Sequence, residues 1–174
     1  MKLKLSNILQ IVAAFFAVLA IVCLFLPGVS QKVSEMGATA TISISLIGLV
    51  FGGGPLKMTF SGGGESANRS TDYKGCMSIF GLLAFILLVV AIVLAIVAIV
   101  MKKSNLLIPA GAVAVVAGLC VLLVMVAGTD SEGTAFKDIM DLYNFKLGIG
   151  SILFAVSAIL GGGLLVASKV MDTK

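Results

Sequence analysis

The fold is decided by the stretch "TISISLIGLVFGGGPLKMTFSGGG", residues 41–64, which lies between two long apolar runs. Apolar residues alternate with Ser, Thr or Lys in both halves of it, namely Ile42, Ile44 and Leu46 in the first half and Leu56, Met58 and Phe60 in the second. Strict alternation predicts a β-strand with one buried face, and β-branched Thr and Ile suit such a surface. Gly52-Gly53-Gly54-Pro55 separates the halves and predicts a turn or a wide loop. The stretch is therefore predicted to form a β-hairpin.

A re-entrant segment that dips into a bilayer is the alternative interpretation of "LIGLVFGG", residues 46–53. A bilayer accommodates non-helical backbone only where protein or water satisfies its polar groups, and Lys57 follows closely. We therefore favour a hairpin that lies in water.

Such a hairpin needs cover, because two strands alone are marginally stable in water. "QKVSEM", residues 31–36, is predicted to add a third strand, and "ESANRST", residues 65–71, is interpreted as the return to the next apolar run. Residues 129–146 are predicted to hold a short helix that begins at Asp130 or Ser131. The apolar residues at helical spacing in it are Phe136, Ile139, Met140 and Tyr143. The loops are expected to form one small cap, and apolar surface left over on it would be a docking face.

Beyond the hairpin, the composition is that of a membrane protein. Of the 174 residues, 60% are hydrophobic and 11% are charged, whereas soluble domains have about 45–50% and about 25%. A helix needs about 20 apolar residues to cross a hydrocarbon layer of about 30 Å. Four segments without Asp, Glu, Lys or Arg meet this length, namely residues 7–27, 76–101, 105–128 and 147–168. The predicted fold is a single integral membrane domain over residues 1–174, an all-α four-helix transmembrane bundle with a small extracellular β-hairpin or sheet in the first outer loop.

Lysine placement predicts how the chain lies in the cell membrane. The two tails and the short link after the second span carry Lys2, Lys4, Lys102, Lys103, Lys169 and Lys174. Basic residues in short segments at span ends mark the cytoplasmic side. The chain is therefore predicted to be a multi-pass protein of the cell membrane with both termini cytoplasmic, and with outer loops at residues 28–75 and 129–146.

Small residues recur at helical spacing on three of the spans, and such residues let helices approach closely in lipid. They are Ala84, Ala91 and Ala98 on the second span, Ala110, Ala114 and Gly118 on the third, and Ser157, Ala158, Gly161 and Gly162 on the fourth. Packing within one four-helix bundle is the first interpretation. A seam between copies of the chain is the alternative.

The sequence offers little chemistry for catalysis. It has no His, and its spans contain no ionisable residue of the kind that marks ion paths and proton relays. The polar residues in the spans are interpreted as packing residues, and the main ones are Gln10, Ser78, Ser151 and Ser157. Asp138 and Asp141 are interpreted as part of a solvated face. We therefore predict no enzyme activity, no catalytic residue, and no cofactor-binding or metal site.

The net charge of +4 comes from lysines that flank apolar spans, so no nucleic-acid partner is predicted. Cys23, Cys76 and Cys120 fit no metal-binding spacing. Cys23 and Cys76 lie toward the same end of their spans, and both a disulfide and two buried free thiols remain open. Asn68-Arg69-Ser70 matches the N-glycosylation sequon, either as a modified site in a eukaryotic secretory host or as a chance match.

The predicted topology resembles that of claudin-like tetraspan proteins, with short cytoplasmic ends, a long β-rich first outer loop and a short second loop. The likeness covers the whole chain as topology. Claudin first loops carry a Gly-Leu-Trp signature and a cysteine pair, whereas this chain has no Trp and no cysteine between Cys23 and Cys76. The resemblance therefore implies a fold, and it carries over no functional residue and no barrier or paracellular pore.

These observations favour a non-enzymatic four-span membrane protein that acts in structural assembly or protein–protein interaction through its extracellular β-cap. The expected partners are the lipid bilayer and either further copies in a homo-oligomer or other membrane proteins. The alternatives are an oligomeric channel or pore-forming protein and an accessory subunit of a membrane transporter complex.

Overall fold

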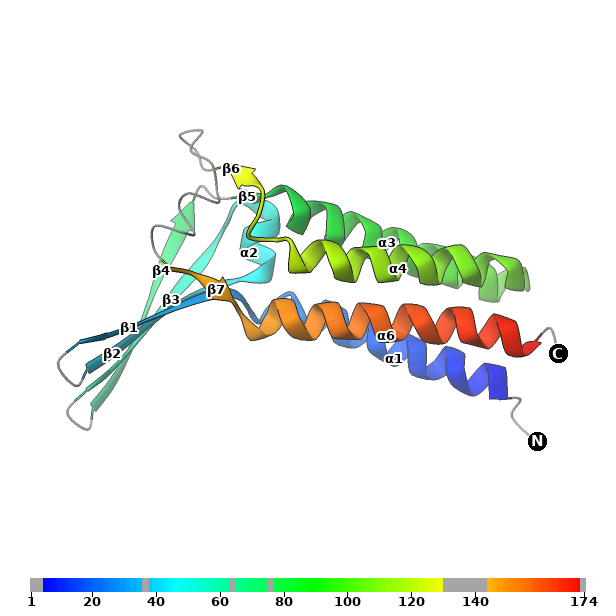
Figure 1. Cartoon of the computed structure of the whole chain (residues 1–174), viewed down its shortest axis with the longest axis horizontal. Helices are drawn as coiled ribbons and strands as arrows, with labels where there is room; N and C mark the ends of the chain where they lie inside the picture. Colours follow the sequence, from blue (N-terminus) through cyan, green and yellow to red (C-terminus); the bar gives the residue numbers. More distant parts are fainter. Residues whose placement is uncertain (1–4, 36–37, 63–64, 75–76, 130–143, 173–174) are drawn as a thin grey trace. The chain divides into compact units, whose positions relative to one another are not determined.

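The computed structural model describes residues 5–35, 38–62, 65–74, 77–129 and 144–172. Within these residues the chain is mostly helical, with four long apolar helices and a small antiparallel sheet (Figure 1). The helices are α1 (Leu5–Cys23), α2 (Leu46–Phe51), α3 (Ile79–Val100), the 3-10 turn η1 (Ser104–Leu106), α4 (Leu107–Leu122) and α6 (Ile149–Asp172). The strands are β1 (Pro27–Glu35), β2 (Ala38–Ser45), β3 (Gly53–Gly62), β4 (Glu65–Lys74), β5 (Met77–Ser78), β6 (Gly128–Thr129) and β7 (Lys146–Leu147).

The four long helices confirm the four apolar segments that the sequence predicts. Their apolar stretches are 19, 22, 19 and 23 residues long, and about 20 residues suffice to cross a bilayer. Some boundaries differ from the prediction. α1 ends at Cys23 rather than Pro27, because Pro27 begins β1 and a proline favours extended backbone in the residue before it. α3 begins at Ile79 rather than Cys76, because Met77–Ser78 pair with Gly128–Thr129.

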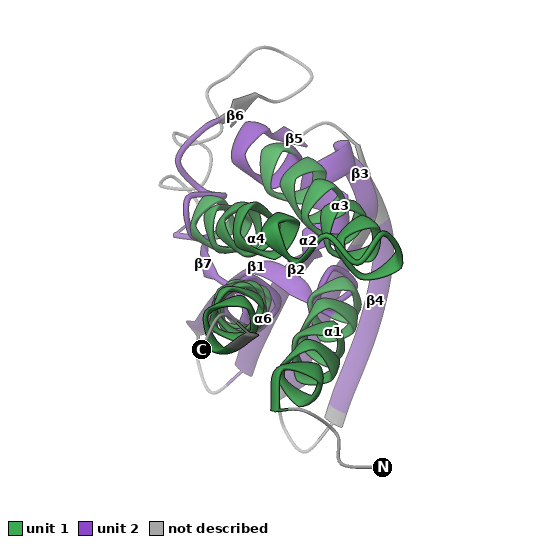
Figure 2. Ribbon diagram, turned by 90° about the vertical axis from the view of Figure 1, so that its right-hand side faces the viewer, with its two compact units in different colours: residues 1–22, 83–121, 153–174 green, residues 23–82, 122–152 purple. Residues whose placement is uncertain are grey.

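The chain divides into two compact units, which Figure 2 colours separately. One unit comprises residues 1–22, 83–121 and 153–174, and its described part holds most of α1, α3, α4 and α6 and the link between α3 and α4. The other comprises residues 23–82 and 122–152, with α2 and every strand that the structure describes. A single integral domain over residues 1–174 stays a prediction.

The helical unit is packed through its small residues. Gly111 of α4 and Gly162 of α6 face each other so closely that a Cβ on either would overlap the carbonyl oxygen of the other. A Cβ at Gly118 would lie 2.9 Å from the carbonyl oxygen of Ala155. The predicted small-residue ridges on α3, α4 and α6 are buried, with Ala84, Ala110 and Ala158 at most 4% exposed. The interpretation of packing within one bundle is therefore confirmed, and the ridges are not free to form a seam with another copy.

The other unit contains a five-stranded antiparallel sheet in the order β4-β3-β2-β1-β7. The predicted hairpin is confirmed, because β2 pairs with β3 in a register that sets Ile42 opposite Met58 and Ile44 opposite Leu56. The third strand predicted from "QKVSEM" is confirmed as part of β1, where Gln31 lies opposite Ile42.

The predicted turn or wide loop at Gly52-Gly53-Gly54-Pro55 is wrong for its last three residues, which belong to β3. The strands are instead connected by α2 and Gly52, and Ser45 caps α2 by accepting a hydrogen bond of 3.3 Å from the backbone N–H of Gly48. Alternation stops at Leu46, and a six-residue helix lets Leu46, Leu49 and Val50 point the same way and become buried. Gly52 ends this helix with a φ of +70°, a conformation that glycine adopts without strain.

The interpretation of residues 65–71 as a plain return is also wrong, because they belong to β4, which pairs with β3 from Gly53↔Lys74 to Gly62↔Glu65. Its Ser, Asn, Asp and Lys residues have low strand propensity, so the pairing with β3 determines the extended backbone. A polar sequence is common on edge strands, where it discourages unwanted pairing.

Candidate interaction surface

The main sheet has two faces of different chemistry, which follow from its register. Residues that lie opposite one another share a face, and alternate residues along a strand share a face. We call one face the apolar face, and it carries Val29, Gln31, Val33, Ala40, Ile42, Ile44, Leu56, Met58, Phe60, Ala67, Arg69 and Thr71. The polar face carries Ser30, Lys32, Ser34, Thr39, Thr41, Ser43, Lys57, Thr59, Ser61, Ser66, Asn68 and Ser70. The alternation that predicts the hairpin therefore extends over four strands.

The apolar face is covered at one end and uncovered at the other. Val29 and Ile44 lie opposite each other and are 0% and 2% exposed. The cross-strand row at the other end consists of Val33, Ala40, Phe60 and Ala67, and we call it the exposed row. Val33 is 38% exposed and Phe60 is 45% exposed. The exposed row is therefore an apolar strip without a cover among the described residues.

Helix α2 provides cover at the buried end of the sheet. A Cβ at Gly28 would lie 2.8 Å from the Cα of Leu46 and 3.0 Å from Cδ1 of Leu49. Gly28 therefore allows β1 and α2 to approach more closely than any other residue would. Leu46 and Leu49 are fully buried there, and burial of a leucine side chain stabilises a fold by about 1.5–3 kcal/mol.

Two buried serines hold the segments of this unit together. The Ser151 hydroxyl donates a 2.7 Å hydrogen bond to the carbonyl oxygen of Gly28, which also accepts a 2.8 Å bond from the backbone N–H of Gly148. The Ser78 hydroxyl donates a 2.6 Å bond to the carbonyl oxygen of Val124 and accepts one from the N–H of Gly81. The interpretation of Ser78 and Ser151 as packing residues is confirmed. Both reach other parts of the chain, so each also joins segments that are distant in sequence.

The sheet has open backbone edges. Among the described residues β4 has one sheet neighbour, β3, and β7 pairs only with Val29 and Ser30 of β1. The exposed side chains of β4 include Ser66, Asn68 and Ser70. An open edge can accept a strand from a partner by backbone hydrogen bonding, and here the polar side chains leave that edge well solvated.

Several predicted features fall on this unit or near it. Asn68 of the sequon is exposed on β4, and its modification stays a prediction. Cys23 and Cys120 are buried free thiols, whereas Cys76, the other member of the considered disulfide, lies outside the described residues. The predicted short helix with Phe136, Ile139, Met140 and Tyr143, its Asp130 or Ser131 cap, and Asp138 and Asp141 also lie outside them.

The described residues offer no cluster for a metal ion, since no three Cys, Asp or Glu side chains among them lie together. The surface that they do offer is an amphipathic sheet with one uncovered apolar strip. The sequence predicts three of the four strands that carry the exposed row, namely β1, β2 and β3. It does not predict β4, because a run of Ser, Asn and Asp gives no strand signal by itself.

No protein-family model matches this chain, and no curated protein matches it in sequence. Four apolar helices and a small sheet fit a tetraspan topology, and the claudin-like resemblance is one of topology.

Proposed function

We propose that this chain is a claudin-like tetraspan protein of the cell membrane in which α1, α3, α4 and α6 each cross the bilayer. The length and apolar character of these helices support this. Connectivity supports it as well. β1 to β4 come from the connection between α1 and α3, and β7 comes from the connection between α4 and α6. Four successive crossings would place these connections on one side of the bilayer, and the pairing of β1 with β7 requires them to be on one side.

We place the sheet outside the cell and both termini in the cytoplasm. Lys102 and Lys103 lie in the short link between α3 and α4, and Lys169 lies in the last turn of α6. Basic residues close to helix ends favour the cytoplasmic side. At this end of the helices, the Lys169 ammonium group donates a 2.8 Å hydrogen bond to the Ser104 hydroxyl.

The proposed function is assembly without catalysis: the outer sheet binds a second copy of this chain through the exposed row. The observation that carries the proposal is the 38% and 45% exposure of Val33 and Phe60, at one end of a face whose other end is covered at Val29 and Ile44. The exposed row itself contains no charged residue, and Arg69 lies in the neighbouring row of the same face. Two exposed rows can therefore meet without a charge inside the contact between them. A symmetric pair of copies uses the same surface twice, which an uncharged apolar strip permits.

The test compares two lysine substitutions at adjacent positions of β3. Phe60→Lys puts a charge into the exposed row, whereas Thr59→Lys puts the same charge on the polar face. Because a buried, unpaired charge is costly, Phe60→Lys is expected to weaken self-association by about tenfold or more, and Thr59→Lys is expected to leave it unchanged. Native mass in mild detergent, measured over a range of protein concentrations, gives the dissociation constant.

Three results would count against the proposal. A wild-type chain that remains a single protomer at all concentrations has no such interface. Equal effects of the two substitutions would remove the exposed row from the interface. A foreign chain that co-purifies with the wild type and is lost in Phe60→Lys would indicate an accessory subunit of a larger complex instead.

A further inference from the structure

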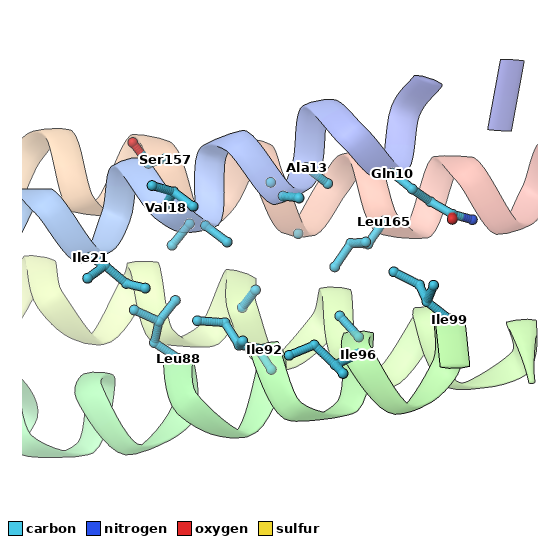
Figure 3. A pocket seen from close by; sticks show the side chains of 18 residues that line it. Gln10, Ala13, Val18, Ile21, Leu88, Ile92, Ile96, Ile99, Ser157 and Leu165 are labelled. Carbon is cyan, nitrogen blue, oxygen red and sulfur yellow. The ribbon is translucent and has the colours of Figure 1, made fainter. Parts of the chain in front are cut away.

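The helical unit contains an apolar groove of about 250 Å³ between α1 and α3, with α4 and α6 contributing to its floor (Figure 3). The walls run from Gln10 to Ile21 on α1 and from Leu88 to Ile99 on α3. The floor is formed by small residues, among them Ala114 of α4 and Ala158 of α6, which are 6% and 4% exposed.

The rim of the groove is open, because side chains that line it are also exposed on the outside of the unit. Val18 and Ile21 of α1 are 59% and 42% exposed, and Ile96 and Ile99 of α3 are 54% and 52% exposed. The groove is therefore accessible from the space beside α1 and α3.

The length of the groove favours one acyl chain as its occupant. Its walls extend for about 16 Å at about 1.5 Å per residue, which is about half of the roughly 30 Å hydrocarbon layer. An acyl chain extends over one leaflet, which is the same half of that layer.

The residues that line the groove determine which chemical class of ligand it can bind. Gln10 and Ser157 are the polar residues among those that line the groove, and the others are aliphatic or glycine. Apolar cavities of comparable size accept apolar ligands, and the lining of this groove has the same chemistry. The lining carries no ionisable residue, so the groove has nothing to bind a charged headgroup.

We propose that the groove binds one acyl chain of a bilayer phospholipid. The proposal rests on the proposed crossing of the bilayer by the four helices, which would place the open rim in contact with lipid tails. A helix of a second copy is the less suitable occupant, because the small-residue ridges of α3, α4 and α6 that would pack such a helix are already buried.

The experiment places the full chain in phosphatidylcholine vesicles that contain a phosphatidylcholine with a photoactivatable diazirine in its acyl chain. Labelled residues are identified by mass spectrometry. Labelling is expected to concentrate on the walls of the groove. Ala95→Phe fills the groove from α3, and it is expected to lower wall labelling about tenfold, as expected when two methylene groups can no longer be buried. Ala112→Phe, on an exposed position of α4 outside the groove, is the matched control and is expected to change nothing.

Labelling that is spread evenly over the exposed apolar residues of all four helices would overturn the proposal. So would wall labelling that Ala95→Phe leaves unchanged or that Ala112→Phe lowers equally, and so would a crosslink from the walls to a second copy. If Ala95→Phe prevents folding, the comparison is repeated with Ala17→Leu on the opposite wall. An alkaline wash of the vesicles distinguishes failure of the two proposals. Release of the chain would show that its helices do not cross the bilayer. Retention of the chain without labelling of the groove walls would overturn the lipid-binding proposal alone.

Discussion

Replacement of Gly162 by alanine is expected to lower the free energy of unfolding by about 3 kcal/mol, as for strong overpacking of a core, whereas the same replacement at Gly163 is expected to cost nothing. A Cβ at Gly162 would overlap the carbonyl oxygen of Gly111 and lie 3.0 Å from a methyl group of Val115. A Cβ at Gly163 has no neighbour within 4 Å. Two adjacent glycines of α6 therefore have opposite structural roles. Alanine is the better helix former by about 1 kcal/mol, so Gly163→Ala is expected to be neutral or slightly stabilising.

The buried thiols of the chain provide the measurement. Cys23 and Cys120 are 1% and 8% exposed, so a thiol-reactive fluorophore reports their exposure as purified protein is heated. Cys76→Ser serves as the common background, so that only these two thiols react. The Gly162→Ala curve is expected at a clearly lower temperature than the Gly163→Ala curve. Identical curves for the two variants would contradict the close contact between α4 and α6.

Leu49→Ala is expected to destabilise the sheet unit by about 3 kcal/mol, within the usual cost of a buried leucine-to-alanine change. Leu49 is fully buried, and its Cδ1 would lie 3.0 Å from a Cβ at Gly28. Removal of the Leu49 side chain beyond Cβ therefore leaves a cavity between α2 and β1. Val33→Ala removes apolar atoms from the same sheet unit at a position that is 38% exposed. This control is expected to cost well under 1 kcal/mol in a single protomer.

The two reporter thiols locate this effect. Cys23 belongs to the sheet unit and Cys120 to the helical unit. Leu49→Ala is expected to make Cys23 reactive at a lower temperature than Cys120, as determined by mass spectrometry of the labelled peptides. If Leu49→Ala behaves like Val33→Ala, then α2 does not form the core of the sheet unit.

The parts of the fold that the sequence predicts well are those with a repeating pattern. Alternation over Ile42–Ile44 and Leu56–Phe60 is sufficient to predict that β2 and β3 form a hairpin with one apolar face. Long uncharged runs are sufficient to locate the four helices. Small residues at intervals of four or seven correctly indicate which helix faces are buried. In each case the same physical requirement recurs along the chain, so the signal accumulates.

The parts that the sequence does not predict depend on a single contact between distant segments. Strand β4 is extended because β3 lies beside it, and most of its own residues carry no such preference. Helix α2 forms because Leu46, Leu49 and Val50 find a common place to be buried. The hydrogen bond from Ser151 to Gly28 spans 123 residues. The sequence identifies Ser151 as a polar residue in an apolar segment but gives no sign of its partner.

The candidate surface also has one part that the sequence predicts and one part that it does not. Its apolar strands are predictable from alternation, and so is the need for cover. In the folded unit Val29 and Ile44 are buried, whereas Val33 and Phe60 stay exposed. This difference cannot be inferred from alternation. The exposed row is therefore found only when register and burial are combined.

We propose that lipid surrounds the four long helices while the sheet lies outside the cell, and side-specific thiol labelling distinguishes the two sides of the membrane. Thr59→Cys places a thiol at an exposed position of β3, and Lys103→Cys places one at an exposed position between α3 and α4. In intact cells, with Cys76→Ser as background, a membrane-impermeant maleimide is expected to label Thr59→Cys and to label Lys103→Cys only after permeabilisation. Labelling of Thr59→Cys only after permeabilisation, or equal labelling of both thiols before it, would show that the sheet does not lie outside the cell with the link between α3 and α4 inside.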